Sequence, residues 1–140
     1  MEDLDRRIVT LLRSDGRMSY TDLGKAMGLS TSAVHQRVRR LEERGVIKGY
    51  TAIVDYPALD LPLTAFISIT PLDPAAPDDI PDRLRDIGEL EACHSVAGEE
   101  NYILKARVCT PGDLEVLLAR VRAAANVATR TTVVLSTPWE

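Results

Sequence analysis

The sequence predicts an α+β protein with a winged-type helix-turn-helix at its N-terminus and a ferredoxin-like βαββαβ domain after it. Three observations support this fold class. Apolar residues recur at helical spacing through the first 45 positions, two prolines within eight residues interrupt the pattern near position 60, and strand-like alternation follows them. The expected division is 1–50 for the helical domain, 51–63 for a strand and linker, and 64–140 for the second domain.

Three short helices are expected in the first domain. Apolar residues at i, i+4, i+7 and i+8 predict the first helix over 4–14. Ser19 begins the second helix, with an acidic residue three positions later as in a capping box, and Gly28 closes it. Ser30 caps the third helix, which Gly45 ends. The tight turn between Gly28 and Ser30 makes the last two helices a helix-turn-helix.

An extended segment is expected after the third helix. A glycine-marked turn over 46–50 leads into the strand-like residues 50–55, which are predicted to form a wing or a return strand. Pro57 and Pro62 then break both helical and strand patterns over 56–63. This proline-containing segment is therefore expected to separate the two domains.

The second domain alternates strands and helices. Two of its extended runs surround a Gly98-Glu99-Glu100 turn, which has the length of a β-hairpin turn. The predicted elements, in order, are a strand at 65–70, a helix with Ile80, Leu84 and Ile87 inside, strands at 91–97 and 101–108, a helix opened by Pro111-Gly112-Asp113, and a strand at 129–137. This βαββαβ order is that of a ferredoxin-like unit.

Charge is divided unevenly along the chain. Residues 1–50 carry ten basic and seven acidic side chains, a net charge of +3, whereas residues 51–140 carry seven and fourteen, a net charge of −7. Asymmetry of this kind predicts a polyanion-binding module joined to a domain with another task. Because a unit of about fifty residues is only marginally stable alone, association between copies is also expected.

The third helix carries the candidate polyanion contacts. With Val34, Val38 and Leu41 inside, helical geometry turns several polar side chains outward. Such side chains can read base edges in the DNA major groove, and flanking cations can bind phosphates. The candidate base readers are Thr31, Ser32, His35, Gln36 and Arg39. The candidate phosphate ligands are Arg37, Arg40, Arg44 and Lys48, and the capping Ser30 completes the candidate DNA-binding set. The alternative is a solvated face on which Arg39 and Glu43 form an ordinary intrahelical ion pair.

Several segments resemble one known family. They are Leu4-Asp5-Arg6-Arg7-Ile8, Gly28-Leu29-Ser30, Arg37-Val38-Arg39-Arg40-Leu41-Glu42, Gly45-Val46-Ile47-Lys48-Gly49-Tyr50, Glu91-Ala92-Cys93-His94-Ser95-Val96-Ala97-Gly98 and Asn101-Tyr102-Ile103-Leu104-Lys105. In this order, and over nearly the whole chain, they resemble the Lrp/AsnC (leucine-responsive, feast/famine) transcription regulators. The resemblance implies a sequence-specific DNA-binding transcription regulator that senses an amino-acid effector. It also implies homodimers that assemble further, with tetramers of dimers (octamers) expected.

A site for a free amino acid must satisfy an ammonium and a carboxylate group. The hairpin turn at 98–101 offers carboxylates, an amide and backbone N–H groups. The resemblance places the effector pocket around this hairpin at a contact between dimers, with matching positions Ser95, Gly98, Glu100, Asn101, Tyr102, Thr131, Thr132 and Val134. Many members of the family have Asp where this chain has Asn101, so Glu99 or Glu100 is the expected ammonium partner and a leucine preference is in doubt. The alternative is an ordinary polar hairpin tip.

At Gly98, glycine's permissive φ is expected to matter for the hairpin turn.

The two cysteines, Cys93 and Cys109, are too few and too isolated for a disulfide framework or a zinc site. Both are expected to be small buried residues.

Other functional classes have little support in the sequence. The chain has no P-loop, no GxGxxG and no nucleophile motif, so no enzyme activity, no cofactor and no metal is expected. It has no apolar run of membrane-spanning length and no secretory signal, which favours a cytoplasmic protein without a membrane partner. Two alternatives stay open, an architectural DNA-binding protein without an effector and a small ferredoxin-like enzyme. A change in thermal stability on adding an amino acid would distinguish an effector-binding regulator from both.

Overall fold

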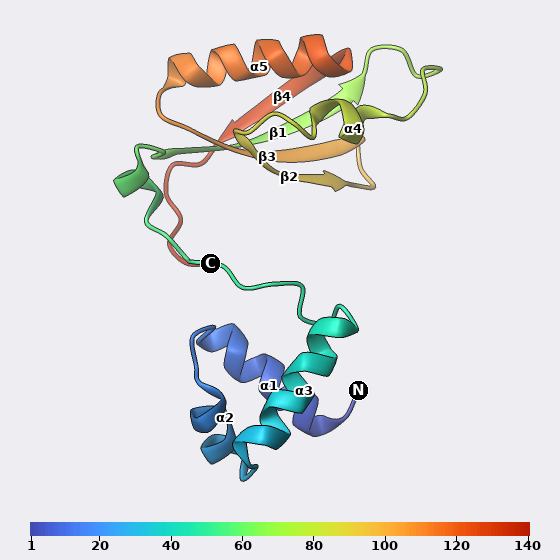
Figure 1. The fold of residues 1–140 in the computed structure, drawn as a ribbon. Helices are drawn as coiled ribbons and strands as arrows, with labels where there is room; N and C mark the ends of the chain where they lie inside the picture. Colours follow the sequence, from blue (N-terminus) through green and yellow to red (C-terminus); the bar gives the residue numbers. More distant parts are fainter. The chain divides into compact units, whose positions relative to one another are not determined.

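A computed structural model describes all residues, 1–140, and divides the chain into two compact units, Met1–Ile53 and Val54–Glu140 (Figure 1). The first unit contains three helices, α1 (Asp3–Ser14), α2 (Tyr20–Met27) and α3 (Thr31–Glu43). Their inner faces form one apolar core, in which the most deeply buried side chains are Ile8, Leu23, Val34, Val38 and Leu41. The helix-turn-helix predicted from the sequence is thus confirmed.

The turn between α2 and α3 is held by local hydrogen bonds and a close backbone contact. Ser19 Oγ accepts the Asp22 N–H at 3.0 Å, although only this half of the expected capping box forms. Gly28 adopts the left-handed region at φ 69°, where glycine carries no steric penalty. Ser30 Oγ then accepts the Ala33 N–H at 3.1 Å and caps α3. These interactions fix the direction in which α3 leaves the turn.

Residues 50–55, which were expected to form a wing or return strand, form no strand, so this prediction was wrong. After α3 the chain turns at Gly45, and the N–H groups of Val46 and Ile47 donate to the Leu41 carbonyl at 2.9 and 3.1 Å. Over residues 48–54 the backbone forms no hydrogen bond with another segment of the chain, and Ile53 is 97% exposed. Strand-like residues form a strand only when a neighbouring strand accepts their hydrogen bonds.

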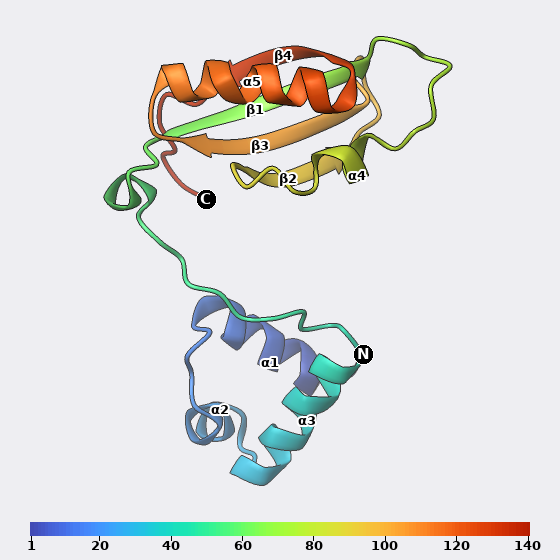
Figure 2. The same cartoon turned by 45° about the horizontal axis from the view of Figure 1, so that its top comes forward.

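The second unit has the predicted βαββαβ order (Figure 2). A short 3₁₀ helix (Tyr56–Leu59) precedes β1 (Leu63–Pro71), α4 (Ile80–Leu84), β2 (Leu90–Ser95), β3 (Tyr102–Val108), α5 (Pro111–Ala125) and β4 (Val127–Val133). The strands are ordered β2-β3-β1-β4, and each neighbouring pair is antiparallel. Both helices pack on one face of the sheet, which leaves the other face uncovered by this unit.

Alternation along the central strands agrees with the sequence. In β3 the side chains of Tyr102, Leu104, Ala106 and Val108 are buried beneath the helices. The opposite face is mixed, with Phe66 paired across the sheet with Lys105 and 38% exposed. Several element bounds differ from expectation, and the differences at α4 and β4 are the clearest. The helix at 80–84 ends before Ile87, which is buried in the following turn, and the last strand occupies 127–133 rather than 129–137.

Cys93 and Cys109 are exposed rather than buried, so the expectation for both was wrong. Cys93 lies on β2, an edge strand with a neighbour on one side only, and Cys109 follows the last residue of β3. Apolar side chains become buried where a helix covers their strand, and here neither thiol is covered within the chain. No helix in the structure has the length and apolar character needed to cross a membrane.

Candidate functional site

The outward face of α3 carries the polar side chains that the sequence assigned to it. Ser32, His35, Gln36 and Arg39 are all exposed, while the intervening Val34 and Val38 are buried. The helix therefore presents hydroxyl, imidazole, amide and guanidinium groups together to solvent. This set can donate to and accept from the edges of DNA bases.

Side chains at the start of α3 are oriented by neighbours on α2. The His35 ring packs edge-on against Tyr20, with ring centroids 5.2 Å apart and planes at 74°. The hydroxyls of Thr31 and Thr21 are 3.5 Å apart. Ser30 Oγ, which caps the helix, also lies 3.2 Å from Ser32 Oγ. The start of the helix thus holds its polar groups in fixed positions, which is what specific recognition requires.

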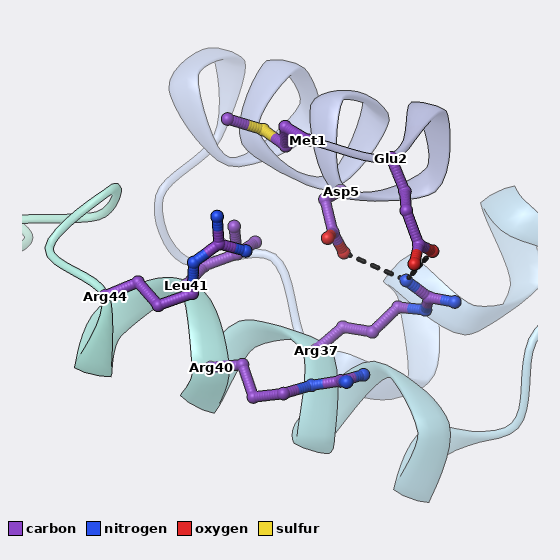
Figure 3. Close-up of a pocket in the computed structure, with 7 residues that line it drawn as sticks. All are labelled: Met1, Glu2, Asp5, Arg37, Arg40, Leu41 and Arg44. Atoms are coloured by element: carbon purple, nitrogen blue, oxygen red, sulfur yellow. Dashed lines mark hydrogen bonds and ion pairs between the residues drawn. The ribbon is translucent and has the colours of Figure 1, made fainter.

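Arg37 differs from the other arginines of α3 because its guanidinium is bound within the domain (Figure 3). Its Nη1 lies 3.0 Å from Glu2 Oε2 and 3.1 Å from Asp5 Oδ1, and its side chain is 19% exposed. The hydrogen bonds that its guanidinium donates to these two carboxylates, that to Glu2 foremost, raise the pKa of Arg37 above its ordinary value. The sequence placed Arg37 among the phosphate ligands because it could not show these partners at the start of α1.

A hollow of about 410 Å³ lies between α1 and α3 (Figure 3). It is lined by Met1, Glu2, Asp5, Arg37, Arg40, Leu41 and Arg44. Arg40, Arg44 and Lys48 have no carboxylate oxygen within 4.0 Å, so their charges are free to meet an external anion. Arg39 pairs with Glu43 at 3.0 Å, as the solvated-face alternative expected, but both side chains are more than half exposed. Exposed pairs of this kind contribute roughly 0.3–0.5 kcal/mol, so Arg39 can exchange its partner.

A second hollow, of about 240 Å³, lies at the hairpin between β2 and β3. Its lining residues are Asp78, Ser95, Val96, Ala97, Gly98, Glu100, Asn101 and Tyr102. The structure therefore brings together five of the expected effector positions, namely Ser95, Gly98, Glu100, Asn101 and Tyr102. The Asn101 N–H donates to the Ile69 carbonyl at 3.1 Å, which fastens the end of the hairpin to β1.

The carboxylates at and beside this hollow have different partners. The Tyr102 hydroxyl donates to Asp78 Oδ1 at 2.6 Å, and this hydrogen bond together with burial raises the pKa of Tyr102 to about 12. The hydroxyl is therefore protonated at neutral pH. Glu100 Oε1 accepts from Arg130 Nη1 at 3.2 Å, and Glu99 Oε2 lies 3.5 Å from the same nitrogen. Arg130 thus compensates both glutamates that were expected to bind an ammonium.

Three expected effector positions lie elsewhere in the chain. Thr131 and Thr132 are paired with Ile67 and Phe66, and the Val134 N–H donates to the Thr64 carbonyl at 2.9 Å. They belong to β4 or follow it, at the opposite sheet edge from β2, and none lines the hairpin hollow. The β4 side chain that does reach the hairpin is that of Arg130, which contacts Glu99 and Glu100 in the same chain.

The backbone of Gly98 corrects another expectation. Its φ lies outside the left-handed region, and an added Cβ would meet no atom within 4 Å. Glycine is therefore not required there by the backbone of the single chain. Only the left-handed turns at Gly28 and Gly45 require glycine in this way.

Sequence reasoning did not identify Asp78 and Arg130 as part of this region. In the sequence, Asp78 is only an acidic residue near the start of a helix, which is a common helix-dipole arrangement. Its contact with Tyr102 spans 24 residues, and that of Arg130 with Glu100 spans 30. Only the sheet register brings these residues together, and no local sequence signal reports it. Nowhere in the chain do three His, Cys, Asp or Glu side chains gather as metal ligands do.

The chain joins a helix-turn-helix, whose third helix has an exposed polar face, to a separate domain with a polar hollow of ligand size. This combination is that of a DNA-binding regulator with a ligand domain. Residues 1–42 match the AsnC-type helix-turn-helix domain, and residues 64–140 match the Lrp/AsnC ligand binding domain. The chain belongs to the Lrp/AsnC family and is a transcription regulator with a DNA-binding domain and an amino-acid-binding domain.

Individual relatives agree with this assignment. The chain is 52% identical over 137 residues to the HTH-type transcriptional regulator LrpA of Mycobacterium tuberculosis, covering 98% of this chain and 91% of LrpA. It is 40% identical to the leucine-responsive regulatory protein of Escherichia coli over 111 residues, which cover 77% of this chain and 67% of that protein. A structure of the M. tuberculosis feast or famine regulatory protein complexed with L-methionine has a TM-score of 0.97 at 51% identity, covering 99% of this chain and 95% of the other.

Proposed function

We propose that this chain reads duplex DNA through the exposed face of α3 and binds a free amino acid in the hairpin hollow. The observation that carries the DNA assignment is the separation of charges on α3. Arg40, Arg44 and Lys48 have no acidic partner, while Arg37 is bound inside the domain. Unpartnered cations beside an exposed polar helix face are the arrangement that a phosphate backbone attracts.

Each DNA-binding residue has a proposed role. Ser32, His35, Gln36 and Arg39 contact base edges, with Ser30 and Thr31 at the helix start, where N-terminal residues of a recognition helix approach the groove. Arg40, Arg44 and Lys48 bind phosphates. Arg37 acts indirectly by holding α3 on α1, because its guanidinium already has two carboxylate partners. This division replaces the assignment of Arg37 as a phosphate ligand.

The proposed ligand is a free amino acid. The hairpin hollow supplies carboxylates, a phenolic hydroxyl and a side-chain amide within about 240 Å³, a chemistry that suits a small zwitterion. The L-methionine complex of the M. tuberculosis protein supports this ligand class, and L-methionine is the first candidate to test. The proposed contacts are Ser95, Gly98, Glu99, Glu100, Asn101 and Tyr102 from the hairpin, with Thr131, Thr132 and Val134 supplied by another chain.

The proposed assembly is a homodimer that associates further, with tetramers of dimers expected. Two features support association. The sheet has one face without helices, on which Phe66 is 38% exposed, and the two groups of effector positions lie at opposite sheet edges. The relatives are named as transcription regulators, and we propose no catalytic role for this chain.

One pair of measurements tests the proposed function. Differential scanning fluorimetry with each of the twenty amino acids should reveal at least one that raises the melting temperature, since a ligand that binds only the native state must stabilise it. Titration of duplex DNA at several salt concentrations should give a salt-dependent affinity that falls in Arg40→Ala and is unchanged in Arg83→Ala, an exposed arginine of α4. Salt-dependent DNA binding without any amino-acid effect would favour the architectural alternative, and absence of DNA binding would overturn the proposal.

A further inference from the structure

The two carboxylates that line the hairpin hollow are not equivalent. Glu100 accepts a hydrogen bond from Arg130, and the neighbouring Glu99 is within ion-pair distance of the same guanidinium. Asp78 lines the hollow from the loop before α4 and forms no ion pair. The charge of Glu100 is therefore already compensated by a guanidinium, whereas that of Asp78 meets no cation within the chain.

Tyr102 holds Asp78 in place. The tyrosine is 8% exposed, and its hydroxyl donates to Asp78 Oδ1 at 2.6 Å. A hydroxyl uses only one acceptor site of the carboxylate, which offers about four lone-pair sites on two oxygens. The other oxygen of Asp78 is therefore free to accept from a ligand. Because the loop residue is fixed by a buried tyrosine, its carboxylate is already positioned before a ligand arrives.

Donor groups on the hairpin complement this acceptor. The N–H groups of Ala97, Gly98, Glu99 and Glu100 donate to no acceptor within the chain, whereas those of Val96 and Asn101 are already bound. Consecutive free N–H groups in a turn form an anion-binding concavity. The hollow thus offers an acceptor on its Asp78 side and donors on its hairpin side, which matches the two charged groups of an α-amino acid.

We propose that Asp78, positioned by the Tyr102 hydroxyl, binds the ammonium group of the amino-acid ligand. This inference deepens the proposed function and rests on it. Asp78 replaces Glu99 and Glu100 as the ammonium partner, since Arg130 already compensates those two side chains. It also makes the hollow selective, because a ligand without an amino group leaves the Asp78 charge without a partner.

The test compares two ligands on the full-length chain by isothermal titration. The probes are L-methionine and 4-(methylsulfanyl)butanoate, which has the same carbon skeleton without the amino group. If the screen finds a tighter amino acid, that acid and its des-amino analogue take their place. The wild type should bind the amino acid about ten- to a hundredfold more tightly than the analogue, the range expected for a hydrogen bond between charged groups. The ratio of these two affinities is the quantity to compare between variants.

Substitutions at Asp78 and Tyr102 should change this ratio in a defined way. Asp78→Asn should weaken amino-acid binding about ten- to a hundredfold and leave the analogue unaffected, so that the ratio falls toward one. Tyr102→Phe should lower the ratio less than Asp78→Asn does, because the Asp78 carboxylate is still present but has lost the hydrogen bond from the Tyr102 hydroxyl. The matched control is Asp82→Asn, an exposed aspartate of α4 that pairs with Arg85 and does not line the hollow. It should keep the wild-type ratio.

The outcomes separate this inference from the proposed function. If the wild type discriminates between the probes and Asp78→Asn keeps the full ratio, the inference is overturned while the proposed function stands. If Glu100→Gln, and not Asp78→Asn, removes the preference for the amino acid over its analogue, the ammonium group binds at Glu100 and not at Asp78. If the wild type binds none of the twenty amino acids, the proposed function fails and this inference fails with it. Circular dichroism and DNA titration of each variant establish that its fold is intact.

Discussion

Arg37 Nη1 lies 3.1 Å from Asp5 Oδ1 and so joins α3 to the first turn of α1. Both side chains are less than one-fifth exposed, and Glu2 accepts from the same nitrogen. The orientation of the helix that carries the proposed base readers is thus set in part by two acidic residues near the start of the chain.

This contact predicts that Arg37→Ala lowers the melting temperature more than Arg39→Ala does. The first change leaves two carboxylates without their cation, and the second removes an exposed pair of small value. DNA affinity should also fall in Arg37→Ala. The slope of log affinity against log salt concentration should stay the same, whereas loss of one phosphate contact would reduce it by about 0.9. Thermal melting and salt-dependent titration check this. An unchanged melting temperature together with a reduced salt slope would make Arg37 a phosphate ligand.

Arg39 and Lys48 should affect DNA binding differently. Arg39→Ala should reduce discrimination between cognate and non-cognate duplexes by roughly 1–3 kcal/mol, because a base reader contributes to specificity. Lys48→Ala should weaken binding to all duplexes alike and flatten the salt dependence. Both variants are measured by titration on two duplexes at several salt concentrations. Equal binding by the wild type and both variants would remove the proposed interface.

Gly24 should be essential to the helix-turn-helix. A Cβ at this position would lie 2.5 Å from the Leu29 carbonyl oxygen, so Gly24→Ala must push the turn away from α2. We expect a loss of about 1–3 kcal/mol, typical of overpacking and larger than alanine's gain in helix propensity. Gly49→Ala is the matched control, since a Cβ there meets no atom within 4 Å. Urea unfolding compares them, and equal stabilities would contradict the tight turn.

Tyr102 predicts a stability change at high pH. Its hydrogen bond to Asp78 and its burial raise its pKa from 10.0 to about 12 in the folded chain. The folded state therefore holds this proton more tightly than the unfolded state. The contribution is fully present below pH 10 and is lost as the pH rises through about 12. Tyrosinate absorbance should show a tyrosine that titrates near 12, and Asp78→Asn should lower its pKa and so identify it as Tyr102. Tyrosine titration that is the same in the wild type and in Asp78→Asn would contradict the contact.

Sequence patterns were sufficient where structure depends on local spacing. The apolar periodicity around Val34 and Val38 predicted which side of α3 is exposed, and the alternation around Leu104 predicted the buried face of β3. The same reasoning failed where the outcome depends on a distant partner. Residues 50–55 have strand-forming side chains but no strand beside them.

Long-range contacts explain the parts of the site that the sequence did not predict. The carboxylate partners of Arg37 are 32 and 35 residues away, and Asp78 is 24 residues from Tyr102. A count of charges along the sequence does not distinguish the arginines of α3 from one another. In the folded chain Arg37 is paired with two carboxylates, whereas Arg40 has no carboxylate partner. Five effector positions on the hairpin converge because they are adjacent in one turn. The remaining positions, on β4 and just after it, do not line that hollow.

We expect amino-acid binding to change DNA binding, and Gly98 provides a specific variant with which to test this. A Cβ at Gly98 would meet no atom within 4 Å, and an arginine there would place a long side chain at the hollow that Gly98 lines. Gly88→Arg is the matched control, because a Cβ there also meets no atom within 4 Å and Gly88 does not line the hollow.

The most direct measurement is titration of a duplex carrying two half-sites about 34 Å apart, with and without the amino acid, with light scattering of the same samples. We expect the ligand to change both DNA affinity and particle size in the wild type and in Gly88→Arg, since binding at one site must be linked to the other. In Gly98→Arg the ligand should change neither, while binding to a single half-site stays close to wild type. DNA affinity that none of the twenty amino acids alters, or a full ligand response in Gly98→Arg, would contradict it.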